Sequence, residues 1–207
     1  KLSFTGSTPV GVSLLEKAAK GVLRTSMELG GNAPFVVFDD ADLDKAVDGA
    51  IAAKFRNSGQ ACTAANRFIV HRSVAEEFAR RVTERVEAFR VGRGTEEGVV
   101  VGPLIDDRAV AKADALVKDA VGRGATLRAG GSAIDGPGSF YQATVLSDVQ
   151  AGSEILSEEI FGPVLAVVRI DSFDEALKLV NDHEYGNGTS IFTRDGDAAR
   201  EFADKIE

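Results

Sequence analysis

Cysteine, tryptophan and histidine are scarce in this sequence of 207 residues, which contains one Cys, two His and no Trp. One cysteine cannot form an internal disulfide, so the composition fits a reducing compartment and we expect a cytoplasmic protein. Two histidines are too few for a histidine-based metal cage, and we predict no metal site. Apolar runs are short as well, far below the roughly 20 residues that cross a bilayer, so we expect a soluble protein with no membrane contact.

Positive charge is limited too. The 32 Asp and Glu residues outnumber the 24 Lys and Arg residues and leave a net charge of -8. No stretch is basic enough to follow a phosphate backbone, so we expect no nucleic-acid partner. Hydrophobic residues make up 44% of the chain, which is enough to fill the core of a sizeable globular domain.

Apolar spacing along most of the chain predicts alternating helices and strands. The 3.6-residue period predicts amphipathic helices at 43–55, 74–89, 110–121, 173–180 and 198–206. Asp42 and Ser73 are suited to cap the first two of these helices. Short apolar runs predict strands, covered on both faces, at 34–38, 67–71, 164–170 and 189–193. The alternation predicts an α/β fold with a three-layer, mainly parallel sheet and flanking helices.

The opening residues read as a separate strand-turn-helix unit. "KLSFTG" predicts a strand, and the turn after it contains Gly6, Ser7 and Gly11. Such a unit delivers small residues to a helix N-terminus, a geometry that accepts phosphate oxygens, although the pattern is neither the dinucleotide fingerprint nor a P-loop. Because residue 1 is Lys and already belongs to the strand, we expect the chain to be part of a longer protein.

Cys62 lies in "NSGQACTAANRF", among small and polar residues. A free cysteine is most often a buried and inert core residue. Here, however, its neighbours favour a loop that follows a helix and precedes a strand, and α/β scaffolds present reactive groups on such connections. Cys62 is therefore a candidate nucleophile, provided that its surroundings activate the thiolate.

Two acidic stretches are further candidates. In "MELGGNAP", Glu28 precedes Gly30 and Gly31, which permit a sharp turn beside it. In "SEEIFGPV", residues 157–164, a pair of Glu residues is followed by Phe and a Gly-Pro turn. Taken alone, Glu28 is an ordinary solvated turn residue and the Glu pair an ordinary surface feature.

Together, four stretches follow the order and spacing of a known family. They are "FTGSTPVG", "MELGGNAPFVVFDDADLDKAV", "GQAC" and "EEIFGPV". The sequence resembles the aldehyde dehydrogenase superfamily across essentially its whole length. The resemblance implies that residues 1–27 are the last strand-helix unit of a Rossmann-like dinucleotide-binding domain and that residues 28–207 are the catalytic domain without its C-terminal end. It also implies a homodimeric or homotetrameric parent protein.

The resemblance assigns the chemistry to two residues. Cys62 matches the nucleophile that attacks the aldehyde carbon, and Glu28 matches the general base that activates water to hydrolyse the resulting thioester. The backbone N–H of Cys62 is expected to donate to the developing oxyanion. The family's second oxyanion donor, an Asn side chain, has no counterpart in this sequence.

The resemblance also implies a cofactor, NAD or NADP. Gly6 and Ser7 match residues beside its pyrophosphate, and the backbone of Leu29 matches a contact at the nicotinamide end. Glu159 matches the residue that holds the hydroxyls of the nicotinamide ribose, and Phe161 matches a residue packed near the ring. Nothing in the sequence distinguishes NAD from NADP.

Arg56 lies six residues before Cys62 and is the candidate substrate-binding residue. An Arg at a helix end commonly just complements the helix dipole and projects into water. Its guanidinium is also suited to clamp a carboxylate at the far end of a short aldehyde. "KFRNSGQAC" is similar to the succinate-semialdehyde dehydrogenase subgroup, which favours the second interpretation. Ala64 occupies the position where several members carry a second Cys, so we expect no disulfide switch.

Three alternatives remain open from the sequence. A general aldehyde dehydrogenase would make Arg56 incidental. A CoA-acylating semialdehyde dehydrogenase would use CoA in place of water, but such enzymes lack the general-base Glu, so Glu28 argues for hydrolysis. The isolated chain is also expected to be a folded module without turnover, because most of the cofactor domain lies outside it. His71 and His183 are expected to be structural.

Overall fold

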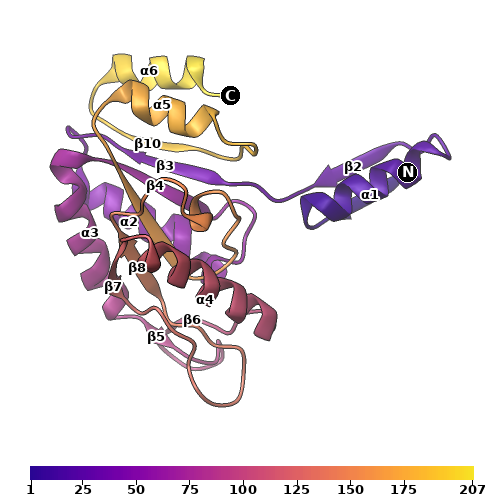
Figure 1. Cartoon of the computed structure of the whole chain (residues 1–207), viewed down its shortest axis with the longest axis horizontal. Helices are drawn as coiled ribbons and strands as arrows, with labels where there is room; N and C mark the ends of the chain where they lie inside the picture. Colours follow the sequence, from indigo (N-terminus) through magenta and orange to yellow (C-terminus); the bar gives the residue numbers. More distant parts are fainter. The chain divides into compact units, whose positions relative to one another are not determined.

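The computed structural model describes residues 1–207, which divide into two compact units, Lys1–Gly31 and Asn32–Glu207. The first unit is a two-stranded parallel sheet with one helix (Figure 1). Its elements are β1 (Leu2–Thr5), α1 (Thr8–Ala19) and β2 (Thr25–Glu28). The strand and helix predicted from the sequence are both present, and β2 is an additional strand that the sequence pattern did not indicate.

The second unit is built on a six-stranded sheet in the order β10-β3-β4-β9-β8-β7. Its strands are β3 (Ala33–Val37), β4 (Ala65–His71), β7 (Thr126–Ala129), β8 (Thr144–Ser147), β9 (Val164–Ile170) and β10 (Ser190–Phe192). All neighbours are parallel except β7 and β8. The mainly parallel sheet is confirmed. The antiparallel edge strand β7 was not predicted, because its first half is exposed and its sequence shows no apolar alternation.

Helices cover both faces of this sheet (Figure 1). They are α2 (Leu43–Phe55), α3 (Arg72–Glu87), α4 (Asp107–Gly122), α5 (Phe173–Asn181) and α6 (Gly196–Lys205). In β3, Phe35 and Val37 pack with α2 and α3, whereas Val36 and Phe38, the residue that follows the strand, pack with α5 and α6. Successive side chains of a strand point to opposite faces, so one fully apolar strand serves both helix layers. None of the helices is long and apolar enough to span a membrane.

Smaller elements complete the second unit. They are the two-stranded pair β5 (Arg90–Val91) and β6 (Val99–Val101) and the short helices η1 (Arg56–Gly59) and η2 (Glu154–Leu156). On the face covered by α5 and α6, α4 packs over the other half of the sheet, with Leu116 and Val117 in one cluster with Leu146 of β8. The predicted three-layer arrangement is confirmed by these two helix layers around the sheet.

The predicted helix caps are half right. Asp42 caps α2, and its side chain accepts a hydrogen bond from the Lys45 backbone N–H at 3.3 Å. The prediction that Ser73 caps the next helix is wrong, because α3 begins at Arg72 and its N-cap is His71. The imidazole Nδ1 of His71 accepts a hydrogen bond from the Ser73 backbone N–H at 3.4 Å. The histidine ring thus caps a free N–H group in the first turn of α3.

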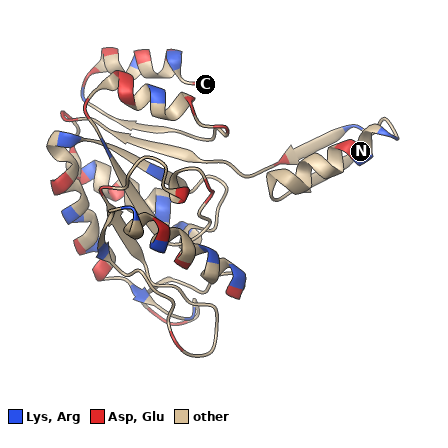
Figure 2. Ribbon diagram, viewed as in Figure 1, with Lys and Arg blue, Asp and Glu red and all other residues tan.

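Charged residues of both signs are interspersed along the exposed side of α3 (Figure 2). Two arginines of α3, Arg81 and Arg85, pair with Asp44 and Asp48 of α2, each at 2.7 Å. These pairs are largely exposed, and each such pair contributes only about 0–1 kcal/mol. The apolar contacts between the two helices therefore dominate their packing.

Candidate active site

Cys62 is exposed on the connection between η1 and β4, where the sequence placed it. Helix α2 ends at Phe55, and the chain then turns sharply through Asn57 and Ser58, whose φ angles are 52° and 57°. This left-handed backbone is rare for residues other than glycine. It persists where the surrounding structure fixes it, and such strain is common at functional sites.

Two side chains that precede Cys62 hold this loop against residues 102–105. The Ser58 hydroxyl donates to the Gly102 carbonyl at 3.3 Å and accepts from the Gly102 N–H at 2.9 Å. The Gln60 amide donates to the Pro103 carbonyl at 3.2 Å and accepts from the Ile105 N–H at 2.9 Å. Both side chains use a donor and an acceptor, so they fix the loop in one register.

Gly59 brings the loop against the segment that contains the candidate cofactor residues. Its φ is 73°, and a Cβ at this position would lie 2.2 Å from the Gly162 carbonyl oxygen. The same Cβ would lie 3.1 Å from the Lys54 carbonyl oxygen. Gly59 is thus packed between the end of α2 and the 158–162 segment, and only glycine allows this approach.

Replacing Gly59 by Ala is expected to destabilise the second unit by about 2–4 kcal/mol, because a backbone carbonyl cannot move aside as a side chain can. Gly98→Ala is the control: its φ is 77°, yet a Cβ added there would have no atom within 4 Å. The left-handed backbone alone should destabilise that variant, by about 1–2 kcal/mol. Urea unfolding of this chain measures both, and equal losses would contradict a tight contact at Gly162.

Asn66 fixes the other side of the loop to the same segment. The residue is 2% exposed, four positions after Cys62. Its amide donates to the Glu158 carbonyl at 2.8 Å and accepts from the Ile160 N–H at 3.0 Å. The two bonds bracket Glu159, so the candidate nucleophile loop and the candidate ribose-binding residue are held by one buried side chain.

The 158–162 segment presents Glu159 and Phe161 in different ways. Glu159 is partly buried, and its carbonyl accepts from the Lys112 ammonium of α4 at 2.6 Å. Phe161 is 40% exposed and has a φ of 50°. A left-handed backbone is uncommon for a residue other than glycine and persists where the surrounding structure fixes it, so the neighbours of Phe161 hold its backbone in this conformation.

Arg56 reaches the residue that follows Cys62. Its guanidinium donates to the Thr63 hydroxyl at 3.2 Å, and its side chain is exposed. From the opposite end of the chain, the Asn187 amide donates to the Cys62 carbonyl at 2.6 Å. Sequence reasoning missed Asn187 and Asn66 because each acts through a contact more than 90 residues away along the chain.

The remaining candidates lie in the first unit. Glu28 is the exposed last residue of β2, and its carbonyl accepts from the Gly6 N–H at 3.0 Å. Ser7 is the exposed N-cap of α1, its side chain makes no capping bond, and the first turn has no acidic residue. Leu29 packs its side chain onto Gly11, where a Cβ would lie 2.5 Å from the Leu29 Cδ2. Gly6, Ser7, Glu28 and Leu29 are thus brought together within this unit.

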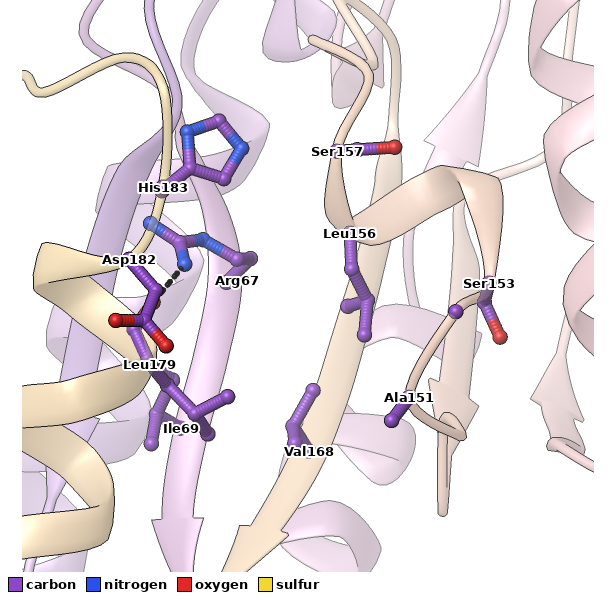
Figure 3. A pocket seen from close by; sticks show the side chains of 11 residues that line it. Arg67, Ile69, Ala151, Ser153, Leu156, Ser157, Val168, Leu179, Asp182 and His183 are labelled. Atoms are coloured by element: carbon purple, nitrogen blue, oxygen red, sulfur yellow. Dashed lines mark hydrogen bonds between the residues drawn. The ribbon is translucent and has the colours of Figure 1, made fainter.

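A cavity of about 250 Å³ elsewhere in the second unit contains none of these candidates. Figure 3 shows Arg67 and His183 on one wall, across from Leu156. Arg67 donates to the Asn32 side chain at 2.8 Å, and burial lowers its pKa to about 10. Burial also lowers the pKa of His183, whose Nδ1 accepts from the Tyr185 N–H at 3.0 Å. Arg67 therefore connects β4 to Asn32, whereas His183 bonds within its own segment.

The chain belongs to the aldehyde dehydrogenase family, whose sequence pattern matches residues 1–207. It is 55% identical over 207 residues to a succinate-semialdehyde dehydrogenase of Paenarthrobacter nicotinovorans, which covers 100% of this chain and 46% of the relative. It is 47% identical over 195 residues to the NADP(+) succinate-semialdehyde dehydrogenase GabD of Escherichia coli (strain K12), covering 94% of this chain and 40% of that protein.

A solved structure gives the same result for the fold. The crystal structure of succinate-semialdehyde dehydrogenase from Burkholderia pseudomallei matches with a TM-score of 0.98 and 45% identity, over 100% of this chain and 43% of that one. The family resemblance and the fold predicted from the sequence are therefore confirmed. The chain spans less than half the length of these relatives.

Proposed function

We propose that this chain carries the catalytic residues of an NAD(P)-dependent aldehyde dehydrogenase that oxidises succinate semialdehyde to the dicarboxylic acid. One observation carries the proposal. Cys62 is exposed on a loop that Gly59 and Asn66 hold, from its two sides, against the segment of Glu159 and Phe161. These contacts support a site in which the Cys62 thiol and the residues expected to hold the nicotinamide ribose act together.

The reaction assigns Cys62 and Glu28 successive roles. The Cys62 thiolate forms a C–S bond to the aldehyde carbon, and the backbone N–H of Cys62 donates to the oxyanion that develops. A bound pyridine nucleotide supplies the acceptor for the hydride that leaves this carbon. Glu28 then takes a proton from water, the water oxygen attacks the Cys62 thioester, and the C–S bond breaks to release the acid.

The residues of the first unit fit the nucleotide that this reaction needs. A helix N-terminus carries partial positive charge and unsatisfied N–H groups, which favour phosphate oxygens. At α1 these groups are served by no side-chain cap, and Gly6 and Ser7 are exposed beside them. We propose that residues 1–27 form the end of the dinucleotide-binding domain and residues 28–207 the catalytic domain, a boundary four residues before the one between the two compact units. Leu29 would meet the nicotinamide end through its backbone.

Arg56 supports a carboxylated substrate. Its exposed guanidinium lies within hydrogen-bond distance of Thr63, next to the nucleophile. A guanidinium recognises a carboxylate through two parallel hydrogen bonds, and succinate semialdehyde carries one at the end opposite its aldehyde. The relatives named for succinate semialdehyde agree with this choice.

The test compares Arg56→Met with the unchanged sequence in a full-length enzyme that carries this chain. We expect KM for succinate semialdehyde to rise about 10- to 100-fold, the loss of one charge-assisted contact, while KM for butanal, a neutral aldehyde of equal length, stays unchanged. Arg90→Met, which removes an exposed arginine paired with Glu96, is the control. Equal effects on both aldehydes would remove the substrate assignment and leave a general aldehyde dehydrogenase.

The acceptor of the acyl group separates hydrolysis from CoA transfer. Glu28 supports hydrolysis of the thioester by water. Single-turnover assays with water alone or with added CoA distinguish the two outcomes. Formation of acyl-CoA at the expense of the free acid would favour the CoA-acylating alternative.

We further propose that the chain by itself folds but does not turn over, and that the full-length enzyme is cytoplasmic and a homodimer or homotetramer.

A further inference from the structure

Lys54 is a buried charged residue that the proposed reaction does not use. It lies in the last turn of α2, is 0% exposed, and its ammonium has no hydrogen-bond partner. An unpaired ammonium in a protein core is costly, because burial removes its hydration. Burial lowers the pKa of Lys54 to about 7, and the charge of Glu159 acts in the opposite direction. The sequence of α2 already shows the anomaly, since Lys54 continues the buried stripe of Val47 and Ala50.

Backbone contacts hold the end of α2, which contains Lys54, against the segment that contains Glu159. Gly59 packs against the Lys54 carbonyl on one side and the Gly162 carbonyl on the other. Asn66 holds the backbone on both sides of Glu159, and the Glu159 Oε1 is shielded from solvent. The end of α2 and the Glu159 turn are therefore fixed relative to each other by contacts that do not involve either charge.

Other charged groups near α2 have their own partners. From α3, Arg81 and Arg85 pair with Asp44 and Asp48 in the first half of α2. From α4, the Lys112 ammonium bonds to the Glu159 carbonyl. From β4, Arg67 donates to Asn32 and to the Leu179 carbonyl. Glu159 is the acidic residue whose electrostatic interaction raises the pKa of Lys54, against the larger effect of burial.

We propose that Lys54 is a positioning residue for Glu159, and that its buried ammonium keeps the Glu159 carboxylate ionised and in place to receive the hydroxyls of the nicotinamide ribose. This inference rests on the proposed function, because it takes Glu159 as the ribose-binding residue. An opposite charge in a poorly solvated site favours the ionised form of a carboxylate, and an ionised carboxylate accepts hydrogen bonds more strongly than a neutral acid.

The proposal predicts that cofactor affinity depends on the protonation of Lys54. As pH rises through about 7, Lys54 becomes neutral and its electrostatic attraction for the Glu159 carboxylate is lost. The dissociation constant of the cofactor should therefore increase. In Lys54→Met, which has similar length and no charge, binding should be about tenfold weaker than in the unchanged protein at pH 6, as for loss of one orienting contact. The difference should close by pH 9.

Isothermal titration calorimetry of NAD and NADP binding to the full-length enzyme, without substrate, measures these constants. Lys118→Met, which removes an exposed lysine of α4, is the control for loss of one positive charge. Thermal unfolding of Lys54→Met should show an unchanged or higher midpoint, because the variant removes a buried ammonium. If the variant does not fold, the pH dependence of binding by the unchanged protein still decides the question, and a flat profile overturns the proposal.

Glu159→Gln separates this proposal from the proposed function. If Glu159→Gln binds both nucleotides as tightly as the unchanged protein, Glu159 is not the ribose-binding residue and the cofactor assignment fails. If Glu159→Gln weakens binding but Lys54→Met does not, or weakens it equally at every pH, the role of Lys54 is overturned. The expected result is that Lys54→Met adds no further loss in the Glu159→Gln background.

Discussion

Replacing Cys62 by Ala in a full-length enzyme that carries this chain should lower kcat at least about 10⁴-fold, because the covalent route loses its nucleophile. Cofactor binding and the thermal midpoint should be unchanged, since Cys62 is exposed and its backbone carbonyl still accepts from Asn187. Production of NADH or NADPH from succinate semialdehyde, followed by absorbance, measures the loss. Residual turnover above one hundredth of the starting rate would contradict covalent catalysis at Cys62.

Labelling of the isolated chain provides a second measurement on the same residue. Because the sequence has one cysteine, the mass increase after iodoacetamide treatment reports on Cys62 alone. A rate well above that of a cysteine in an unstructured peptide would show that this chain by itself activates the thiol. A rate equal to that of the peptide would show that activation depends on residues outside this chain.

Replacing Glu28 by Gln should separate the two halves of the reaction. The first half, up to the Cys62 thioester, should proceed and release about one equivalent of reduced cofactor per active site, whereas steady-state turnover should fall about 10²- to 10⁴-fold because water is no longer activated. Stopped-flow absorbance resolves this burst, and mass spectrometry should detect the acyl group on Cys62.

Glu16→Gln is the matched control for this experiment, because Glu16 is an exposed carboxylate on α1 of the same unit. It should leave both the burst and the steady state unchanged. A Glu28→Gln enzyme that keeps full steady-state turnover would assign the base to another residue. Loss of the burst itself would instead place Glu28 before or at hydride transfer.

The sequence was sufficient for the helices and the central strands because their signals are local. The stripe from Leu43 to Phe55 predicts α2 with its observed ends, and the run from Val164 to Ile170 predicts β9 likewise. Both patterns reflect burial on one face or on two, and burial of this extent dominates local preference. The cap of α3 was mispredicted because a histidine side chain took the place that Ser73 was expected to fill.

The sequence alone determined the family, the α/β class and the candidate residues, because the spacing of Cys62, Glu28 and the 157–164 stretch along the chain is itself the signal. The tertiary structure decided which side chains hold them. The roles of Asn66 and Gly59, and the proximity of Lys54 to the Glu159 segment, depend on contacts between segments about 100 residues apart. A buried hydrogen bond, a missing Cβ or a desolvated charge can be recognised only once the neighbouring groups are in place.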